Sequence, residues 1–98
     1  MAATTMDAQT EAEAAGSTPD THIAALRTRI DEIDATIIRL WQERAALSQE
    51  VGATRVAAGG TRLVLSRERE ILDRFRRALG EDGTQLALLL LRAGRGRL

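Results

Sequence analysis

The sequence predicts an all-α fold of three helices, one long and two short. Apolar residues recur every three or four positions through a stretch without glycine or proline between Pro19 and Gly52, which is the pattern of an amphipathic helix. Glycines then bound two shorter segments that also carry apolar residues at helical spacing. The chain shows no strand-like alternation of apolar and polar residues and no internal repeat.

The long helix is predicted to begin at Thr18-Pro19, because threonine is a good N-cap and proline suits the first helical position. We expect it to run to about Ala58, with Gly52 tolerated inside it, and to stop at Gly59-Gly60. Its apolar stripe consists of Ile23, Leu26, Ile30, Ile33, Ile37, Leu40, Leu47 and Val51.

A helix of roughly 39 residues is about 58 Å long, more than two short helices can cover in a compact domain. The sequence therefore predicts an intertwined homodimer in which two long helices pack together. The alternative is that one end of the helix stays solvated.

The two short helices follow from their glycine boundaries. After a loop over residues 59–65, Ser66 is expected to cap a second helix that ends at Gly80. We expect a turn over residues 81–83 and a third helix from Thr84 to Arg92, which is apolar nearly all round and should be buried. Residues 94–98 are expected to form a non-helical tail.

The first 18 residues contain almost no large apolar side chain, so they are predicted to be a disordered tail, with the helical domain over residues 19–98. The tail lacks the basic start and apolar core of a signal peptide. No later segment has 18 consecutive apolar residues. We therefore expect a cytoplasmic protein without a membrane span.

Composition excludes several kinds of site. The 98 residues include no cysteine and one histidine, His22, which excludes disulfides, thiolate metal sites and histidine triads. Fourteen acidic residues balance fourteen basic ones and only 2% of residues are aromatic, which argues against a nucleic-acid partner. Every basic residue is arginine, the side chain that binds carboxylates with two parallel hydrogen bonds.

Three charged residues stand at positions where the helical spacing predicts apolar ones. Arg44 and Arg55 continue the stripe of the long helix and share one face, and Glu68 lies in the seam of the second helix. Unpaired buried charge is costly. One interpretation is that Glu68 bridges Arg44 or Arg55 in a structural site. The other is that the leftover positive charge, with Arg67 beside it, favours a small anion in an apolar pocket.

The order of these residues is itself informative. It consists of Leu26-Arg27-x-x-Ile30-Asp31-x-x-Asp34, Glu43-Arg44, Val51-Gly52-x-x-Arg55 and Ser66-Arg67-Glu68-Arg69-Glu70. This set resembles the all-helical (AroQ-type) chorismate mutases over about residues 23–98. The linker over residues 59–64 and the ending over residues 89–98 look like the compact actinobacterial (delta) subclass.

The resemblance implies an isomerase that converts chorismate to prephenate, on the route to phenylalanine and tyrosine, with no cofactor and no metal. The composition agrees, because this pericyclic rearrangement needs neither a nucleophile nor an acid–base step. The enzyme must hold a flexible dianion in a reactive conformation. It must also place positive charge beside the ether oxygen, where negative charge grows as the C–O bond breaks.

The resemblance also implies roles for individual residues. Arg44 would bind a substrate carboxylate, Arg55 would contact the ether oxygen and a carboxylate, and Glu68 would accept a hydrogen bond from the ring hydroxyl. Arg67 would help to bind carboxylate, and Val64 stands in the site where some relatives have an acidic residue. Some relatives also carry a glutamine in the third helix, and residues 86–91 have none.

Two further roles would involve other chains. Arg27 would reach the pocket of the other subunit, which helix geometry supports, because it lies about 25 Å along the helix from Arg44 and roughly 100° around it. Members of the compact subclass are weak alone and are activated by the heptulosonate-phosphate (DAHP) synthase. The tail Arg95-Gly96-Arg97-Leu98 resembles the segment used for that contact, and a frayed terminus is the alternative.

Three other functions fit parts of the sequence. An isochorismate pyruvate lyase shares the fold and the arginine set. A non-enzymatic helical dimerisation module would consume no chorismate. A nucleic-acid binder using the Arg-Gly tail is disfavoured by the neutral net charge and the lack of aromatic residues.

Overall fold

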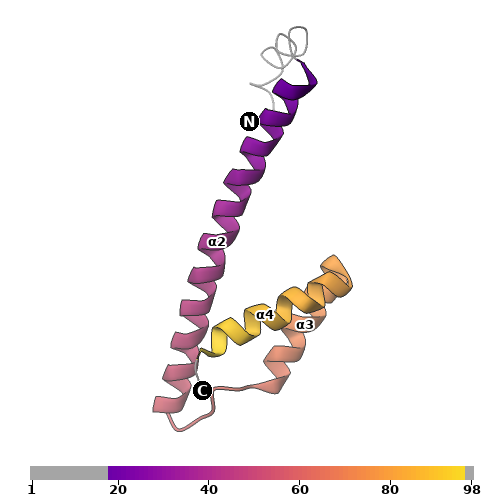
Figure 1. Ribbon diagram of the computed structural model, residues 1–98. Helices are drawn as coiled ribbons and strands as arrows, with labels where there is room; N and C mark the ends of the chain where they lie inside the picture. Colours follow the sequence, from indigo (N-terminus) through magenta and orange to yellow (C-terminus); the bar gives the residue numbers. More distant parts are fainter. Residues whose placement is uncertain (1–17, 97–98) are drawn as a thin grey trace, which may run out of the picture. The chain divides into compact units, whose positions relative to one another are not determined.

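The computed structural model describes residues 18–96, and these form three α-helices. They are α2 (Pro19–Ala57), α3 (Leu65–Leu79) and α4 (Glu81–Arg95), shown in Figure 1. The predicted all-α fold with one long and two short helices is confirmed for this part of the chain. The chain divides within α2 into two compact units, which meet between Thr36 and Ile37 and are described separately. None of the described helices is long and apolar enough to cross a membrane.

The N-terminal unit contains the first half of α2, and its start is as predicted. The backbone N–H of Thr21 donates to Thr18 Oγ1 at 3.1 Å, so the threonine side chain caps the helix. Pro19 takes the first helical position. The predicted disordered tail lies outside the described residues, apart from this capping threonine.

The C-terminal unit contains the second half of α2, which ends one residue earlier than predicted. Gly59 has a φ of 91°, a left-handed conformation that favours glycine, and the N–H of Gly60 donates to the carbonyl of Arg55 at 2.7 Å. Gly52 lies inside the helix and is buried, as expected of a tolerated interior glycine. A short loop then leads to α3.

The start of α3 differs from the prediction that Ser66 caps it. The N-cap is Val64, which has extended backbone angles and makes no side-chain cap, and the N–H of Glu68 already donates to the carbonyl of Val64 at 3.1 Å. Ser66 therefore lies inside the first turn. The helical backbone of α3 begins one residue before Ser66, at the apolar Leu65.

The predicted turn over residues 81–83 is wrong, because these residues form the first turn of α4. Gly80 alone makes the connection, with a φ of 72°, and it accepts backbone hydrogen bonds from Gly83 and Thr84. Gly83 is buried against α3, where a Cβ atom would collide with the carbonyl oxygen of Phe75. Its glycine allows a close approach between helices rather than a turn.

At the other end, α4 continues through Gly94 and Arg95, which were predicted to be a non-helical tail. Gly94 is buried where the last turn of α4 meets α2, and a Cβ atom there would lie 2.5 Å from Ser48 Oγ. This glycine too permits a close approach. The helix ends before Gly96, which has a φ of 68°.

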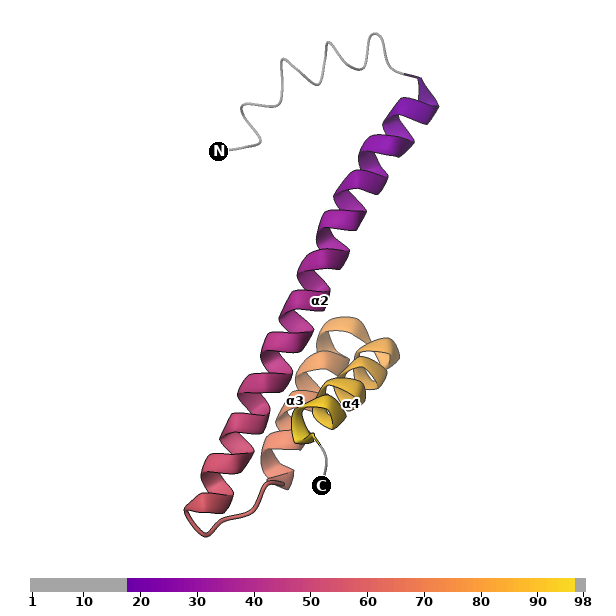
Figure 2. The ribbon, with the colours of Figure 1, turned by 60° about the vertical axis from the view of Figure 1, so that its left-hand side comes forward.

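Helices α3 and α4 run side by side in both ribbon views (Figures 1 and 2). Their core consists of Ile71, Ala87 and Leu91, with Leu72 and Phe75 packed against it. The third helix was expected to be buried because it is apolar nearly all round, and in the single chain only part of it is. One face is buried, whereas Leu88 and Leu89 remain 47% and 43% exposed, because α4 has neighbours on one face only.

Candidate active site

The C-terminal unit contains a cavity of about 290 Å³ formed by α2, the loop after it, α3 and α4. Five of the residues predicted from the sequence line it, namely Arg44, Arg55, Val64, Arg67 and Glu68. These residues come from α2, from the end of the loop and from α3, and the fold places them around one cavity. The apolar lining includes Leu47, Val51, Ile71 and Leu91.

Arg44 is one of the two half-buried arginines of this cavity, and Arg95 is the other. Its Nη1 donates to the carbonyl of Leu90 near the end of α4 at 3.3 Å, and a cation is favourable near a helix C-terminus. Burial, followed by the positive charges of Arg67 and Arg74, lowers the pKa of the Arg44 guanidinium. The group still carries its charge at any ordinary pH. The positive charges that lower its pKa also favour an anion beside it.

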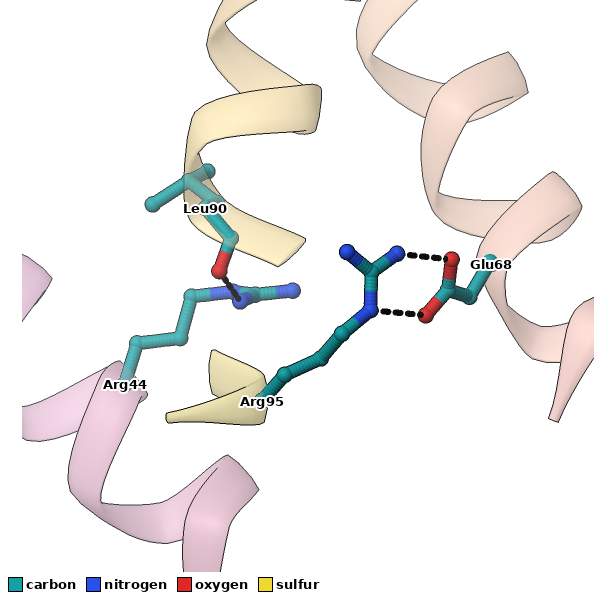
Figure 3. A network of polar contacts seen from close by, with 4 residues as sticks. All are labelled: Arg44, Glu68, Leu90 and Arg95. Atoms are coloured by element: carbon teal, nitrogen blue, oxygen red, sulfur yellow. Dashed lines mark hydrogen bonds and ion pairs between the residues drawn. The ribbon is translucent and has the colours of Figure 1, made fainter. Parts of the chain in front are cut away.

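Glu68 is paired, but not with the arginines that the sequence suggested. Figure 3 shows its carboxylate facing Arg95, whose Nη2 lies 2.6 Å from Oε1 and whose Nε lies 3.3 Å from Oε2. The interpretation in which Glu68 bridges Arg44 or Arg55 does not hold in the described residues, because Arg95 takes their place. The reason is that α4 is longer than predicted, so residue 95 is helical and faces α3.

The last turn of α4 is fastened to α2 by a second polar contact. Gln49 Nε2 donates to the carbonyl of Ala93 at 2.9 Å, beside the close approach of Gly94 to Ser48. The Ala93 carbonyl lies in the last turn, where carbonyls lack an N–H partner within the helix, so Gln49 supplies its donor. The bond from Arg44 to the Leu90 carbonyl adds a second contact one turn earlier. The C-terminal end of α4 is thus held over the cavity.

Sequence reasoning missed Arg62, which also lines the cavity. Its side chain lies across Gly52, with Cγ 3.5 Å from where a Cβ of residue 52 would be. The absence of a side chain at this helical position leaves room for the arginine. An interior glycine on the same face as Arg44 and Arg55 was the available signal.

The two remaining predicted arginines of the cavity are more open to solvent. Arg55 is exposed on α2, and Arg67 is exposed on α3, where its Nη1 pairs with Glu70 at 3.0 Å. Surface pairs of this kind are weak, so Arg67 can exchange Glu70 for another anion at little cost.

Two other predicted residues that the structure describes, Arg27 and Gly96, do not line the cavity. Arg27 belongs to the N-terminal unit, is exposed, and is absent from the lining of the cavity. Gly96 is exposed after the end of α4, and Arg97 and Leu98 lie outside the described residues. Arg95, which was predicted only to bind a partner, lines the cavity instead.

The charges of the cavity favour an anionic ligand. Its lining includes five guanidinium groups, from Arg44, Arg55, Arg62, Arg67 and Arg95, and one carboxylate, that of Glu68. Since Glu68 is taken by Arg95, the other four positive charges have no counterion within the lining. The fold and the cavity thus define a class: an all-helical protein with a small cavity lined by several arginines and by apolar side chains.

Comparison with known proteins identifies the family. Residues 26–90 match the sequence model described as chorismate mutase type II. An intracellular chorismate mutase of Mycolicibacterium smegmatis is 56% identical over 73 residues, which cover 74% of this chain and 70% of that protein. The intracellular chorismate mutase of Mycobacterium tuberculosis is 48% identical over 82 residues, 84% of this chain and 77% of that protein. The chain belongs to the chorismate mutase type II family.

A solved structure agrees with this assignment. It is a non-covalent complex of DAHP synthase and chorismate mutase from Corynebacterium glutamicum with a bound transition state analog. The match has a TM-score of 0.76 and 44% sequence identity, and it covers 81% of this chain and 95% of that one. The fold is therefore that of a chorismate mutase of the all-helical type.

Proposed function

We propose that this protein is a chorismate mutase, which isomerises chorismate to prephenate without a cofactor. The observation that carries the proposal is the excess of guanidinium groups in one small cavity. Chorismate is a dianion, and two carboxylates need at least two such groups. Family membership supplies the reaction, and the charge of the cavity fits its substrate.

Arg44 and Arg55 are proposed to do most of the catalytic work. The Arg44 guanidinium, held by the Leu90 carbonyl, binds one substrate carboxylate and fixes the reactive conformation. Arg55 donates to the ether oxygen as negative charge grows there, a stabilisation that costs no reorganisation because the group is already charged. Glu68 accepts a hydrogen bond from the ring hydroxyl, and Arg67 and Val64 complete the binding site.

Loss of Arg55 tests this mechanism. Removing one donor to a developing oxyanion costs about 2.7–4 kcal/mol, or roughly 10²–10³ in rate. We expect Arg55→Ala to lose that much in kcat, measured as the disappearance of chorismate. A change of less than about fivefold would show that Arg55 does not contact the ether oxygen.

We also propose that the active form is a homodimer in which Arg27 enters the partner's cavity. The apolar stripe of α2, from Ile23 to Val51, is 41–57% exposed in the single chain, so it lacks the cover that such a stripe needs. Arg27 belongs to the N-terminal unit and does not line the cavity of the C-terminal unit. We therefore propose that a second chain brings its Arg27 to the ligand that Arg44 binds.

Subunit exchange tests the shared site. Arg27→Ala and Arg44→Ala each leave every site of their own homodimer defective. Mixed in equal amounts, they form heterodimers as about half of all dimers, each with one intact site, which restores about a quarter of wild-type activity. Absence of recovery, after exchange is confirmed by native mass spectrometry, would contradict the shared site.

We further propose that the protein acts in the cytoplasm with DAHP synthase as its activating partner. The related chorismate mutase of Corynebacterium glutamicum forms a complex with that enzyme, and the mycobacterial relatives are named intracellular. The proposed contact is the C-terminal segment, residues 95–98.

An assay with two substrates separates the proposal from the rival lyase. The protein is incubated with chorismate and, separately, with isochorismate, and the products are resolved by chromatography. A chorismate mutase forms prephenate from the first. Formation of salicylate and pyruvate from the second, with no prephenate from the first, would assign the protein as an isochorismate pyruvate lyase.

A further inference from the structure

The last two turns of α4 are bonded to both kinds of charged group that the proposed mechanism needs. The Leu90 carbonyl accepts from Arg44, and five residues later Arg95 donates to both oxygens of Glu68 (Figure 3). The cation that would bind a substrate carboxylate and the carboxylate that would bind its hydroxyl are therefore both held by α4.

The Arg95–Glu68 pair differs from the other ion pairs between residues 18 and 96. The others join residues three or four apart on one helix, with side chains 54–70% exposed. This pair joins α4 to α3, with side chains 33% and 18% exposed, and it is bidentate. Such geometry fixes the orientation of a carboxylate as well as its charge.

The surroundings of Glu68 show what this orientation prevents. Arg44, Arg55 and Arg67 line the same cavity. A half-buried carboxylate without Arg95 would turn to one of them, because an unpaired charge in that position is costly. It would then neutralise a guanidinium that the substrate dianion needs and would leave the place where the ring hydroxyl binds.

We propose that Arg95 is a positioning residue of the active site, acting through Glu68 rather than on the substrate. It keeps the Glu68 carboxylate on the α3–α4 side of the cavity and leaves Arg44 free for a substrate carboxylate and Arg55 free for the ether oxygen. This inference rests on the proposed chorismate mutase function. It gives Arg95 a role within the free chain, separate from any contact with a partner protein.

The test compares variants of the full chain, each measured first without and then with DAHP synthase. The set is Arg95→Ala, Arg95→Lys, Glu68→Gln, the double variant of Arg95→Ala with Glu68→Gln, and Arg92→Ala, which removes an exposed arginine from the same helix. We expect Arg95→Ala to lower kcat/KM about tenfold and to raise KM. In the Glu68→Gln background the same substitution should add less than about twofold, because the carboxylate to be positioned is already gone.

The controls have distinct outcomes. Arg95→Lys should fall between wild type and Arg95→Ala, since an ammonium group lacks the planar fork; it also serves as the variant to interpret if thermal melting shows that Arg95→Ala is unfolded. Arg92→Ala should match wild type.

Three results would overturn the inference. If Arg95→Ala keeps wild-type kcat/KM in the free chain and loses only activation by the synthase, Arg95 is a partner contact and no more. If it costs the same factor with and without Glu68, it does not act through Glu68. If the wild-type protein is itself inactive on chorismate with and without the synthase, the proposed function fails, and the role of Arg95 fails with it.

Discussion

Replacing Arg44 by lysine tests whether a guanidinium fork, rather than a positive charge alone, binds the substrate carboxylate. In the structure Nη1 of Arg44 is engaged by the Leu90 carbonyl at 3.3 Å. Within residues 18–96, Nε and Nη2 make no hydrogen bond, so they can donate two parallel bonds to a carboxylate. Lysine keeps the charge but cannot make this paired contact.

The expected loss is one hydrogen bond between charged groups. Such a bond contributes about 1.5–3 kcal/mol, and 1.36 kcal/mol corresponds to a tenfold change in rate. We therefore expect Arg44→Lys to lower kcat/KM for chorismate by about 10- to 150-fold. Arg44→Ala, which also removes the charge, should lose more.

Steady-state measurement of chorismate disappearance gives kcat/KM for each variant. Arg39→Lys is the matched control, because Arg39 lies on the same helix with its side chain 65% exposed and a loose 3.9 Å pair with Glu43. It should match wild type. If Arg44→Lys, folded by circular dichroism, stays within about twofold of wild type, Arg44 does not bind the carboxylate as a fork.

Four further predictions concern stability, cavity shape and pH. Gly83→Ala should destabilise the fold by about 1–3 kcal/mol or more in chemical denaturation, despite the higher helix propensity of alanine, because the new Cβ collides with the Phe75 carbonyl; a stabilised variant would contradict this packing. Gly52→Ala should stabilise α2 by up to about 1 kcal/mol, since its Cβ makes only ordinary contact with Arg62. Gly52→Leu should raise KM by displacing Arg62, and an unchanged KM would show that Arg62 is not part of the site. Finally, burial lowers the pKa of Arg44, which favours loss of its proton only at strongly alkaline pH. The kcat/KM should therefore stay constant between about pH 7 and 9, and a fall within that window would contradict a mechanism without proton transfer.

The long helix and the existence of the two short ones could be predicted from the sequence, because local signals determine them. The Thr18 side chain caps the start of α2, and Gly59 supplies the residue with left-handed backbone angles at its end. Part of the candidate site could also be predicted from the sequence, because Arg44 and Arg55 interrupt an apolar stripe whose period is fixed by the helix. These arguments need no knowledge of what lies across from each helix.

The parts that sequence reasoning missed depend on contacts between helices. Gly83 and Gly94 resemble helix breakers locally, yet both lie inside α4 at points where Phe75 and Ser48 leave no room for a side chain. Glycine that permits close packing and glycine that ends a helix look alike in a sequence. Because of this ambiguity, the sequence prediction made α4 too short at both ends.

The partner of Glu68 was missed for the same reason. Arg95 was assigned to a non-helical tail, so it was not considered as a neighbour of a residue 27 positions earlier. Once α4 is known to continue to Arg95, packing of α4 against α3 brings the two side chains together. Long-range pairs of this kind require the tertiary fold.

The most direct test of the proposed function is the rate of chorismate conversion to prephenate by the wild-type protein, measured alone and with DAHP synthase. We expect slow but enzyme-dependent formation of prephenate by the protein alone, and a higher kcat/KM in the presence of the synthase. A rate equal to the uncatalysed reaction under both conditions, from folded protein, would contradict the assignment of the cationic cavity as a chorismate mutase active site.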